Sequence, residues 1–364
     1  MAAIISSKLG KSLYAYTEVI ILLSIEAYLE DIENRLNEEE ELRLREEWLT
    51  WKMHKNPSGP FHPAGRIPRA SKLIWPQINI NDTFQSDDLA ILRELCNING
   101  QLESGSRFLP RVRANTGVGN IPTLFGAELF FMAREADTLP NVRSLGEERT
   151  RSLLNAPTPS FEHGNFPMVE RITRRFLSYW KQYPKIGRFI RIEQPDLQGP
   201  MDNLELLWGS DLFYALYDDP ETIHALLQRL TDTIASYMTH WLQRIPSANS
   251  GASYFNYVEN GFLCLRDDSA MNLSPDFFSE YIAPYDERLL KQFGGIVHFC
   301  GKGDHFIDRL ARLDGLCGIN MTQPHLNDTE KIFTETIDKG LHLCLSAPAS
   351  TSGTHDMRNL TFLC

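Results

Sequence analysis

Short apolar runs alternate with helical patterns from residue 107 onward, and this alternation limits the possible folds more than any other feature of the chain. Runs such as GRFIRIEQ, ASYFNYV, GFLCLRDD, GIVHFCG and LHLCLSAP have the length and composition of buried strands. The stretches between them space their apolar residues as amphipathic helices do. Strands that are separated by helices pair in parallel through right-handed crossovers. The sequence therefore predicts an α/β protein with a parallel sheet.

The number of strand candidates, about seven between residues 107 and 348, favours a (β/α)8 TIM barrel with one strand undetected. A doubly wound open sheet is the alternative, but no glycine-rich phosphate-binding motif follows the first strand. We divide the chain into a helical extension (1–55), an irregular proline-rich segment with a helix packed on the barrel (56–106), the barrel (107–348) and a tail (349–364). The tail is short and β-prone, so we expect it to be poorly ordered, truncated or non-native, leaving the last strand partly uncovered.

Composition and charge exclude several classes of function. The 364 residues carry 36 Lys and Arg against 47 Asp and Glu, a formal net charge of −11, so nucleic acid and membranes are not expected partners. The apolar run VIILLSI near the N-terminus is too short to span a bilayer and has no signal-peptide cleavage site after it. The 6 cysteines are scattered and do not form a disulfide framework. We predict a cytoplasmic protein that acts on a small molecule.

Polar residues gather at the carboxyl ends of the predicted strands, where TIM barrels build their active sites. We assign Asp267 and Asp268 as candidate acid–base residues, although one of them could instead cap the next turn. Arg113 is a candidate anion binder, with an ion pair to Glu193 as the alternative. The expected substrate-binding residues are Arg113, Asn115, Glu193, Tyr257, Asn320 and Gln323.

His298 and Cys300 stand two residues apart at the end of the run GGIVHFCG. Side chains at positions i and i+2 of a strand point to the same side, so these two face one point. An imidazole and a thiolate together form a zinc-type pair of ligands. The alternative is an inert buried thiol beside a hydrogen-bonded core histidine.

Three segments together resemble the uroporphyrinogen decarboxylase superfamily, which also contains zinc-dependent, corrinoid-linked methyltransferases. The first is a G-P segment with a later D-P-E helix start, in LQGPMDNLELLWGSDLFYALYDDPETIHALLQRLTD. The second is RDDSAMNLSPDFFSEYIAPY, and the third is GGIVHFCGKGDHFIDRLARLDGLCGINM with its H-x-C-G strand end. The resemblance implies a TIM barrel and an enzyme that acts on a small molecule.

The resemblance leaves two activities and one inactive state open. The methyltransferases' H-x-C motif is intact here, which implies zinc held by His298, Cys300 and a cysteine near the last strand, for which Cys344 is the candidate. Methyl transfer from a corrinoid, carried by a partner protein, to a thiol would follow. The decarboxylases' R-Q-A-G-R and G-H-G segments are absent. The alternatives are a decarboxylase of uroporphyrinogen-like polycarboxylates, with Arg113 binding carboxylates and Asp267 facing a protonated pyrrole, and an inactive binding member.

Overall fold

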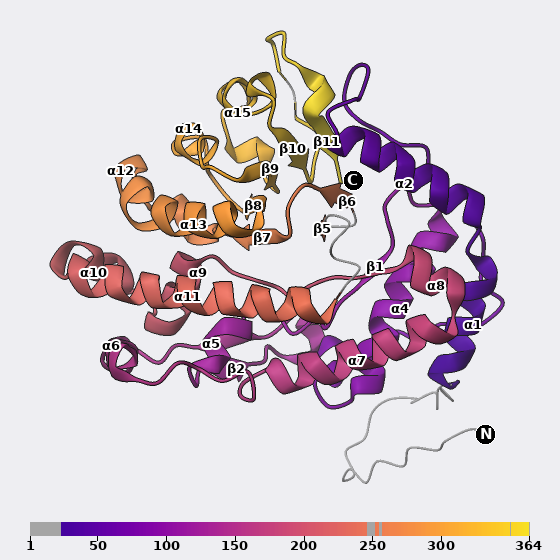
Figure 1. Cartoon of the computed structure of the whole chain (residues 1–364), viewed down its shortest axis with the longest axis horizontal. Coiled ribbons are helices and arrows are strands. Elements are labelled where there is room, and N and C mark those ends of the chain that lie inside the picture. The colour runs from indigo at the N-terminus through magenta and orange to yellow at the C-terminus, as the bar shows by residue number, and fades with distance from the viewer. Residues whose placement is uncertain (1–22, 246–251, 255–256, 350, 364) are drawn as a thin grey trace.

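A five-stranded parallel sheet, with strand order β11-β10-β9-β8-β7, forms the centre of the computed structural model, which describes residues 23–245, 252–254, 257–349 and 351–363 (Figure 1). Strands that follow one another in the sequence are neighbours in the sheet, and helices connect β7 to β10. This arrangement confirms the predicted α/β class with parallel pairing. The strands are β7 (Leu263–Arg266), β8 (Gly295–Phe299), β9 (Leu316–Met321), β10 (His342–Leu345) and β11 (Leu360–Phe362).

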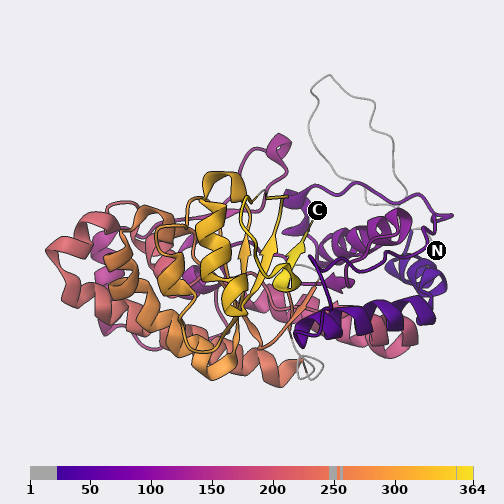
Figure 2. The same cartoon turned by 90° about the horizontal axis from the view of Figure 1, so that it is seen from above.

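Further parallel pairing extends this sheet on both sides. Strands β1 (Arg111–Val112) and β4 (Arg191–Ile192) pair in parallel, and a single bridge joins Gln198 to Arg266 at the β7 edge. At the other edge, Phe61 bridges to Thr361 of β11. This strand order is compatible with a TIM barrel (Figure 2), although the sheets of the described residues do not close into one.

Two expectations about strands and the tail are wrong. The run ASYFNYV, expected to be a strand of the barrel, contributes to an antiparallel pair, β5 (Ala252–Tyr254) and β6 (Tyr257–Glu259). The tail was expected to pack poorly, yet β11 pairs with β10 over its whole length, and Leu360 is fully buried. The β-prone residues of the tail therefore extend the sheet and cover the edge of β10.

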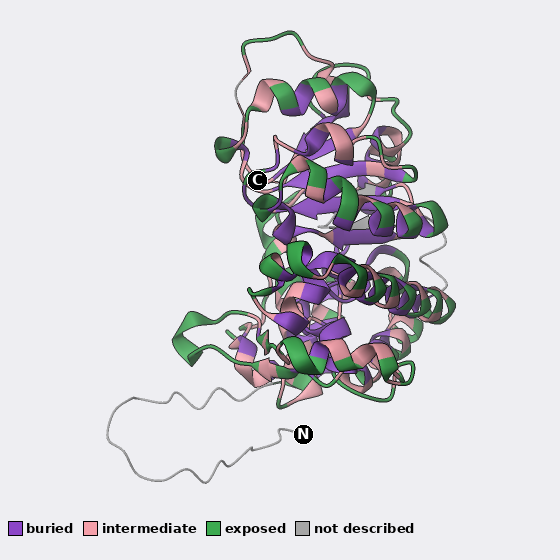
Figure 3. Cartoon of the chain, turned by 90° about the vertical axis from the view of Figure 1, so that its left-hand side faces the viewer, coloured by how far each residue is buried: buried purple, intermediate pink, exposed green. Residues whose placement is uncertain are grey.

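Helices cover the outer side of the strands. Figure 3 shows buried residues in the strands and on the inward faces of the helices, and exposed residues on the outward faces. None of the helices in the described ranges is both long enough and apolar enough to cross a membrane. The helices after β1 are α5 (Asn120–Leu124), α6 (Glu147–Ser152), α7 (Phe166–Gln182), α8 (Pro184–Phe189), α9 (Pro200–Trp208), α10 (Leu212–Asp218), α11 (Pro220–Arg244), α12 (Pro275–Phe277), α13 (Ala283–Phe293), α14 (Ile307–Leu310) and α15 (Thr329–Glu335).

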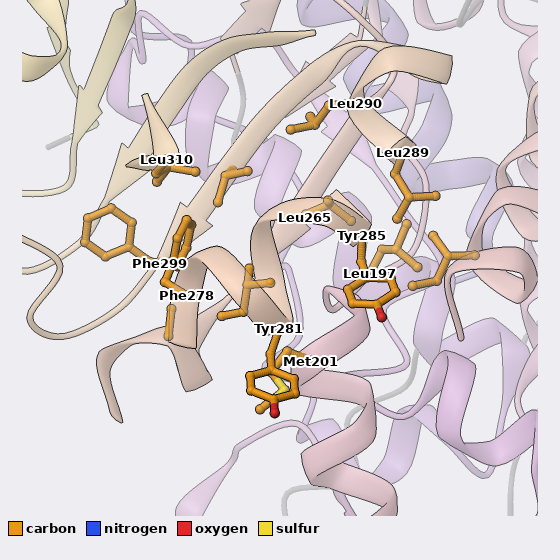
Figure 4. Packing of buried hydrophobic residues seen from close by; sticks show 14 of the residues in the cluster. Leu197, Met201, Leu265, Phe278, Tyr281, Tyr285, Leu289, Leu290, Phe299 and Leu310 are labelled. Carbon is orange, nitrogen blue, oxygen red and sulfur yellow. The ribbon is translucent and has the colours of Figure 1, made fainter. Parts of the chain in front are cut away.

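The main core lies between the sheet and helices α9, α11 and α13. Leu265 of β7, Met201 of α9 and Leu289 of α13 belong to one continuous buried cluster (Figure 4). The chain enters α13 through one π-helical turn, Phe278–Ile282, which places Phe278 and Tyr281 in the same core. An additional antiparallel pair, β2 (Glu128–Phe130) and β3 (Asn141–Arg143), lies outside the central sheet.

The N-terminal part of the chain is helical where the structure describes it, with α1 (Ile25–Arg35), α2 (Glu38–Lys52), α3 (Ile80–Thr83) and α4 (Asp87–Ser104). The Asn37 side chain caps α2, and the four glutamates that follow suit the positive end of its dipole. The proline-rich segment is anchored by Arg66, which forms a buried ion pair with Glu41 of α2. These contacts hold α2 against the rest of the fold.

Helix α2 covers one end of the central sheet. Trp48 and Trp51 of α2 are fully buried and pack with Phe61. The same cluster contains Cys264 of β7 and Ile296 of β8. These two residues precede the polar residues Arg266 and His298 by two positions. The amino end of this sheet face is therefore sealed by aromatic side chains, and the polar residues lie toward its carboxyl end.

Candidate metal centre

Asp268, His298 and Cys300 converge just beyond the carboxyl ends of β7 and β8. Their ligand atoms all lie within 4.8 Å of one another, the single such group of three in the part of the chain that the structure describes. The Cys300 Sγ is 3.4 Å from the His298 Nε2, and the Asp268 Oδ1 is 3.9 Å from the same nitrogen. The shared face of His298 and Cys300 follows from their i, i+2 spacing at the end of β8.

The imidazole of His298 is held in one orientation by Asn320 of β9. The His298 Nδ1 lies 2.5 Å from the Asn320 Oδ1, and that amide in turn donates to the Cys344 carbonyl at 3.0 Å. Because a carbonyl oxygen only accepts, Nδ1 carries the proton and Nε2 presents its lone pair to Cys300 and Asp268. Burial, with a smaller effect of the Arg266 cation, lowers the pKa of His298, so the ring is neutral at pH 7.

The Cys300 thiol has a polar environment on the loop that follows β8. The Thr322 hydroxyl donates to its sulfur at 3.2 Å, and the Cys300 N–H donates to the Asp268 carboxylate at 2.7 Å. Burial raises the pKa of Cys300, and the Thr322 hydroxyl opposes that rise. Gly301 has a φ of 80°, and its N–H donates to Gln323. These contacts fix the loop that carries the sulfur.

A cavity of about 470 Å³ opens beside Asp268. Asp202 and Glu205 of α9 line it together with Asp268, Ser269 and Gln198. The Asp202 carboxylate accepts the N–H groups of Asp268 and Ser269 at 2.8 and 2.9 Å. Asp202 thus holds the turn after β7 in place and aims Asp268 toward the histidine.

Asp267 lies on the opposite side of this turn. It is only 1% exposed, and its carboxyl pairs with that of Asp286 on α13, which is fully buried. Burial is the main cause that raises the pKa of Asp267 well above its usual value and that of Asp286 to about 7. The sequence proposed both Asp267 and Asp268 as site residues, and the structure brings only Asp268 to His298.

Arg113 belongs to a group of buried ions rather than standing alone. It lies 3.8 Å from Asp196, which also pairs with Arg266 at 3.2 Å. Glu193, the expected partner of Arg113, pairs with Arg111 at 2.8 Å instead. Arg113 and Arg266 thus share the one carboxylate of Asp196, while Arg111 pairs with Glu193.

Cys344, the expected third ligand, is not in the metal group. Its residue pairs in register with Asn320 and, through Asn320, with His298. Its side chain nevertheless belongs to the apolar cluster with Trp51 and Ile296. Neighbouring strands of a curved parallel sheet are staggered along its axis, so residues paired in register differ in height. The carboxylate of Asp268 takes the place expected for this thiol.

The other predicted site residues are spread over the fold. Asn320 and Gln323 support the metal group, whereas Asn115 lines a separate cavity of about 460 Å³ beside α4 together with Arg113. Tyr257 lies on β6, and its side chain falls outside the described residues. The sequence analysis missed Asp202, Glu205 and Thr322. The carboxylate of Asp202 in the largely apolar helix α9 was the available signal for a buried polar role.

The donor atoms of this group fit zinc. Imidazole nitrogen, thiolate sulfur and carboxylate oxygen are its usual ligands, and three protein ligands leave a fourth position for a substrate. The hydrogen bond from Nδ1 to Asn320 is the outer contact that a zinc-binding histidine normally makes. Magnesium and calcium prefer sites made of oxygen ligands alone, so this mixed set disfavours them.

Comparison with known families finds one family model that matches part of the chain. Residues 209–332 match the family model described as Uroporphyrinogen decarboxylase (URO-D), a range that contains β7, β8, β9 and all three residues of the metal group. No curated protein matches the chain. The matched range also holds two of the three segments on which the resemblance was first noted. This match, over about a third of the chain, supports membership of the uroporphyrinogen decarboxylase (URO-D) superfamily.

Proposed function

We propose that this protein is a zinc-dependent methyltransferase that transfers a methyl group to a thiol. The observation that carries the proposal is the fixed His298 ring, whose Nε2 lone pair is directed at Cys300 and Asp268. Here one nitrogen is secured by Asn320 and the other faces two further metal-ligand groups.

The residues of the site have separate tasks in this proposal. His298, Cys300 and Asp268 would hold zinc, and Asn320 keeps the histidine in the tautomer that can bind a metal. Zinc, when bound, lowers the pKa of a thiol that takes its open position, so a thiolate nucleophile exists at neutral pH. Asp202 and the Thr322 hydroxyl position the carboxylate and the sulfur. The cavity beside Asp268 gives the reactants room.

The decarboxylase alternative has less support from the geometry. It needs cationic side chains to bind the carboxylates of a porphyrinogen, but Arg113 and Arg266 are both near Asp196. Its candidate carboxylate, Asp267, faces α13 and is buried. The corrinoid partner and the cytoplasmic location, which the resemblance and the composition imply, stay predictions.

Metal analysis of protein purified without added metal tests the proposal. We expect about one zinc per chain, bound through sulfur in X-ray absorption spectra. The double variant His298→Ala, Cys300→Ala should lose the metal, and Asn320→Ala should weaken zinc binding by about 10–100-fold. Asn320→Asp keeps an acceptor beside Nδ1 and should bind zinc nearly as the wild type does.

Replacement of a cysteine outside the site is the matched control. Cys317 lies on β9 away from the metal group, and Cys317→Ala should leave the zinc content unchanged. Zinc retained by the double variant would refute the proposal. A spectrum with only nitrogen and oxygen ligands would do the same.

A further inference from the structure

We propose that the cavity beside the metal centre binds a cationic methyl donor, either a quaternary ammonium or a sulfonium compound. The inference rests on the proposed methyl transfer to a thiol and adds the chemical class of the donor. This donor is an alternative to the corrinoid that the family resemblance implies. The charge, the size and the position of this cavity carry the argument.

The lining of the cavity is acidic. Three carboxylates face it, those of Asp202, Glu205 and Asp268, and no lysine, arginine or histidine lines it among the described residues. The remaining polar lining residues are neutral amides and hydroxyls: Asn141, Ser144, Gln198, Ser210, Ser269 and Asn272. A volume of about 470 Å³ accommodates a small cation together with a small thiol.

The carboxylates differ in what they can offer a ligand. Asp202 is committed to the backbone of the turn after β7, because its carboxylate accepts the N–H groups of Asp268 and Ser269. Asp268 faces the histidine and the cysteine. Glu205, one helical turn after Asp202 on α9, accepts the Ser269 hydroxyl at 2.5 Å on its Oε2. Glu205 is therefore the carboxylate best placed to face a ligand in the cavity.

The sum of charges at the occupied site favours a cation. A divalent zinc ion is balanced in formal charge by the thiolate of Cys300 and the carboxylate of Asp268. The substrate thiolate and Glu205 then each add one negative charge that nothing on the cavity wall offsets. A cation between these two groups is attracted by both, whereas a polycarboxylate is repelled by both.

Methyl transfer from such a donor balances without any further reactant. The thiolate sulfur forms a bond to the methyl carbon while the bond from that carbon to the positive nitrogen or sulfur breaks. The electron pair of the broken bond stays with the leaving atom, which departs as a neutral amine or sulfide. The proton of the starting thiol goes to solvent. A sulfide product no longer has the charge that Glu205 attracted, whereas an amine product regains a positive charge when it takes up a proton.

Binding of two molecules with nearly the same shape tests the proposal. Choline carries a trimethylammonium group, and 3,3-dimethylbutan-1-ol has the same form with a neutral carbon in place of the nitrogen. By calorimetry on the full chain, we expect choline to bind at least about tenfold more tightly. Glu205→Gln should weaken choline binding by about tenfold and leave binding of the neutral alcohol unchanged, which also verifies that the cavity is intact.

An acidic protein attracts cations in general, so a distant carboxylate provides the control. Asp276 is 91% exposed on its side chain, and Asp276→Asn should not change choline binding. Equal affinities for choline and the alcohol, equal losses in both variants, or tighter binding of succinate would overturn the proposal. Zinc content of the same samples separates the two hypotheses. Zinc without a preference for choline would refute only the donor class, and a preference for choline without zinc would refute only the metal mechanism.

Discussion

Two aspartates that follow each other in the sequence have opposite roles in this protein. Asp268 faces His298 and the solvent-accessible cavity, whereas Asp267 faces Asp286 inside the core. Consecutive side chains at the end of a strand point to opposite sides, so one residue of the pair had to leave the site. The buried side now holds two carboxyl groups in contact, an arrangement that works only while at least one of them is protonated.

At the same residue scale, Asp286→Asn should change how stability depends on pH. Burial raises the pKa of Asp286 to about 7 in the folded protein, whereas an aspartate in an unfolded chain ionises near pH 4. The folded state therefore binds more protons between these values, and the free energy of unfolding falls as pH rises from about 4 to about 7. The amide removes this titration, so we expect the fall to shrink by about 1–3 kcal/mol in total.

Urea unfolding between pH 4.5 and pH 8 measures this effect. The exposed Asp276→Asn variant has no such burial and should keep the slope of the wild type. If Asp286→Asn also kept that slope, the buried carboxyl pair would not be the group that titrates.

At the scale of elements, helix α2 closes the end of the central sheet opposite the metal group. Trp51 is fully buried, lies 4.0 Å from the His342 ring between ring centroids, and packs near Phe61. His342 in turn forms a buried pair with Glu259 at 2.8 Å. This end of the sheet thus combines aromatic packing with one buried hydrogen-bonded His–Glu pair, and the stacking of Trp51 on His342 links both to α2.

We expect Trp51→Ala to destabilise the protein by about 3–5 kcal/mol, because a large buried side chain leaves a cavity that the surroundings fill only in part. Chemical unfolding followed by circular dichroism measures the loss. Trp51→Phe, which retains most of the packing, should cost clearly less. A loss below about 1 kcal/mol in Trp51→Ala would mean that α2 is not a fixed part of the fold.

Some elements could be read from the sequence, and others could not, for identifiable reasons. The parallel strands β7 to β10 follow from apolar runs between helices, and the pairing of His298 with Cys300 follows from local strand geometry. The choice of Asp268 over Cys344 depends on the stagger between strands, which no local pattern encodes. Strand β11 has only three residues, and its partner is set by tertiary packing rather than by propensity.

At the scale of the whole molecule, zinc should stabilise the fold by mass action. A metal that binds the native protein and not the unfolded chain adds about 4 kcal/mol when its free concentration is a thousand times the dissociation constant. We expect the melting temperature to rise by several degrees with zinc and to fall when a chelator is added. The His298→Ala, Cys300→Ala variant should melt at one temperature under both conditions. A zinc-dependent shift that persists in that variant would assign the effect to a different site.

The aromatic cluster with which α2 closes one end of the sheet has a consequence for turnover in the proposed reaction. Trp48 and Trp51 pack with Cys264 and Ile296 on the side of α2, and a cavity lies beside Asp268 on the side of the metal group. On the proposed function, donor, acceptor and both products would all pass through this cavity. A methylated product that stays bound there would block the next donor and the next acceptor alike. Accumulated product would therefore inhibit the reaction until it is removed.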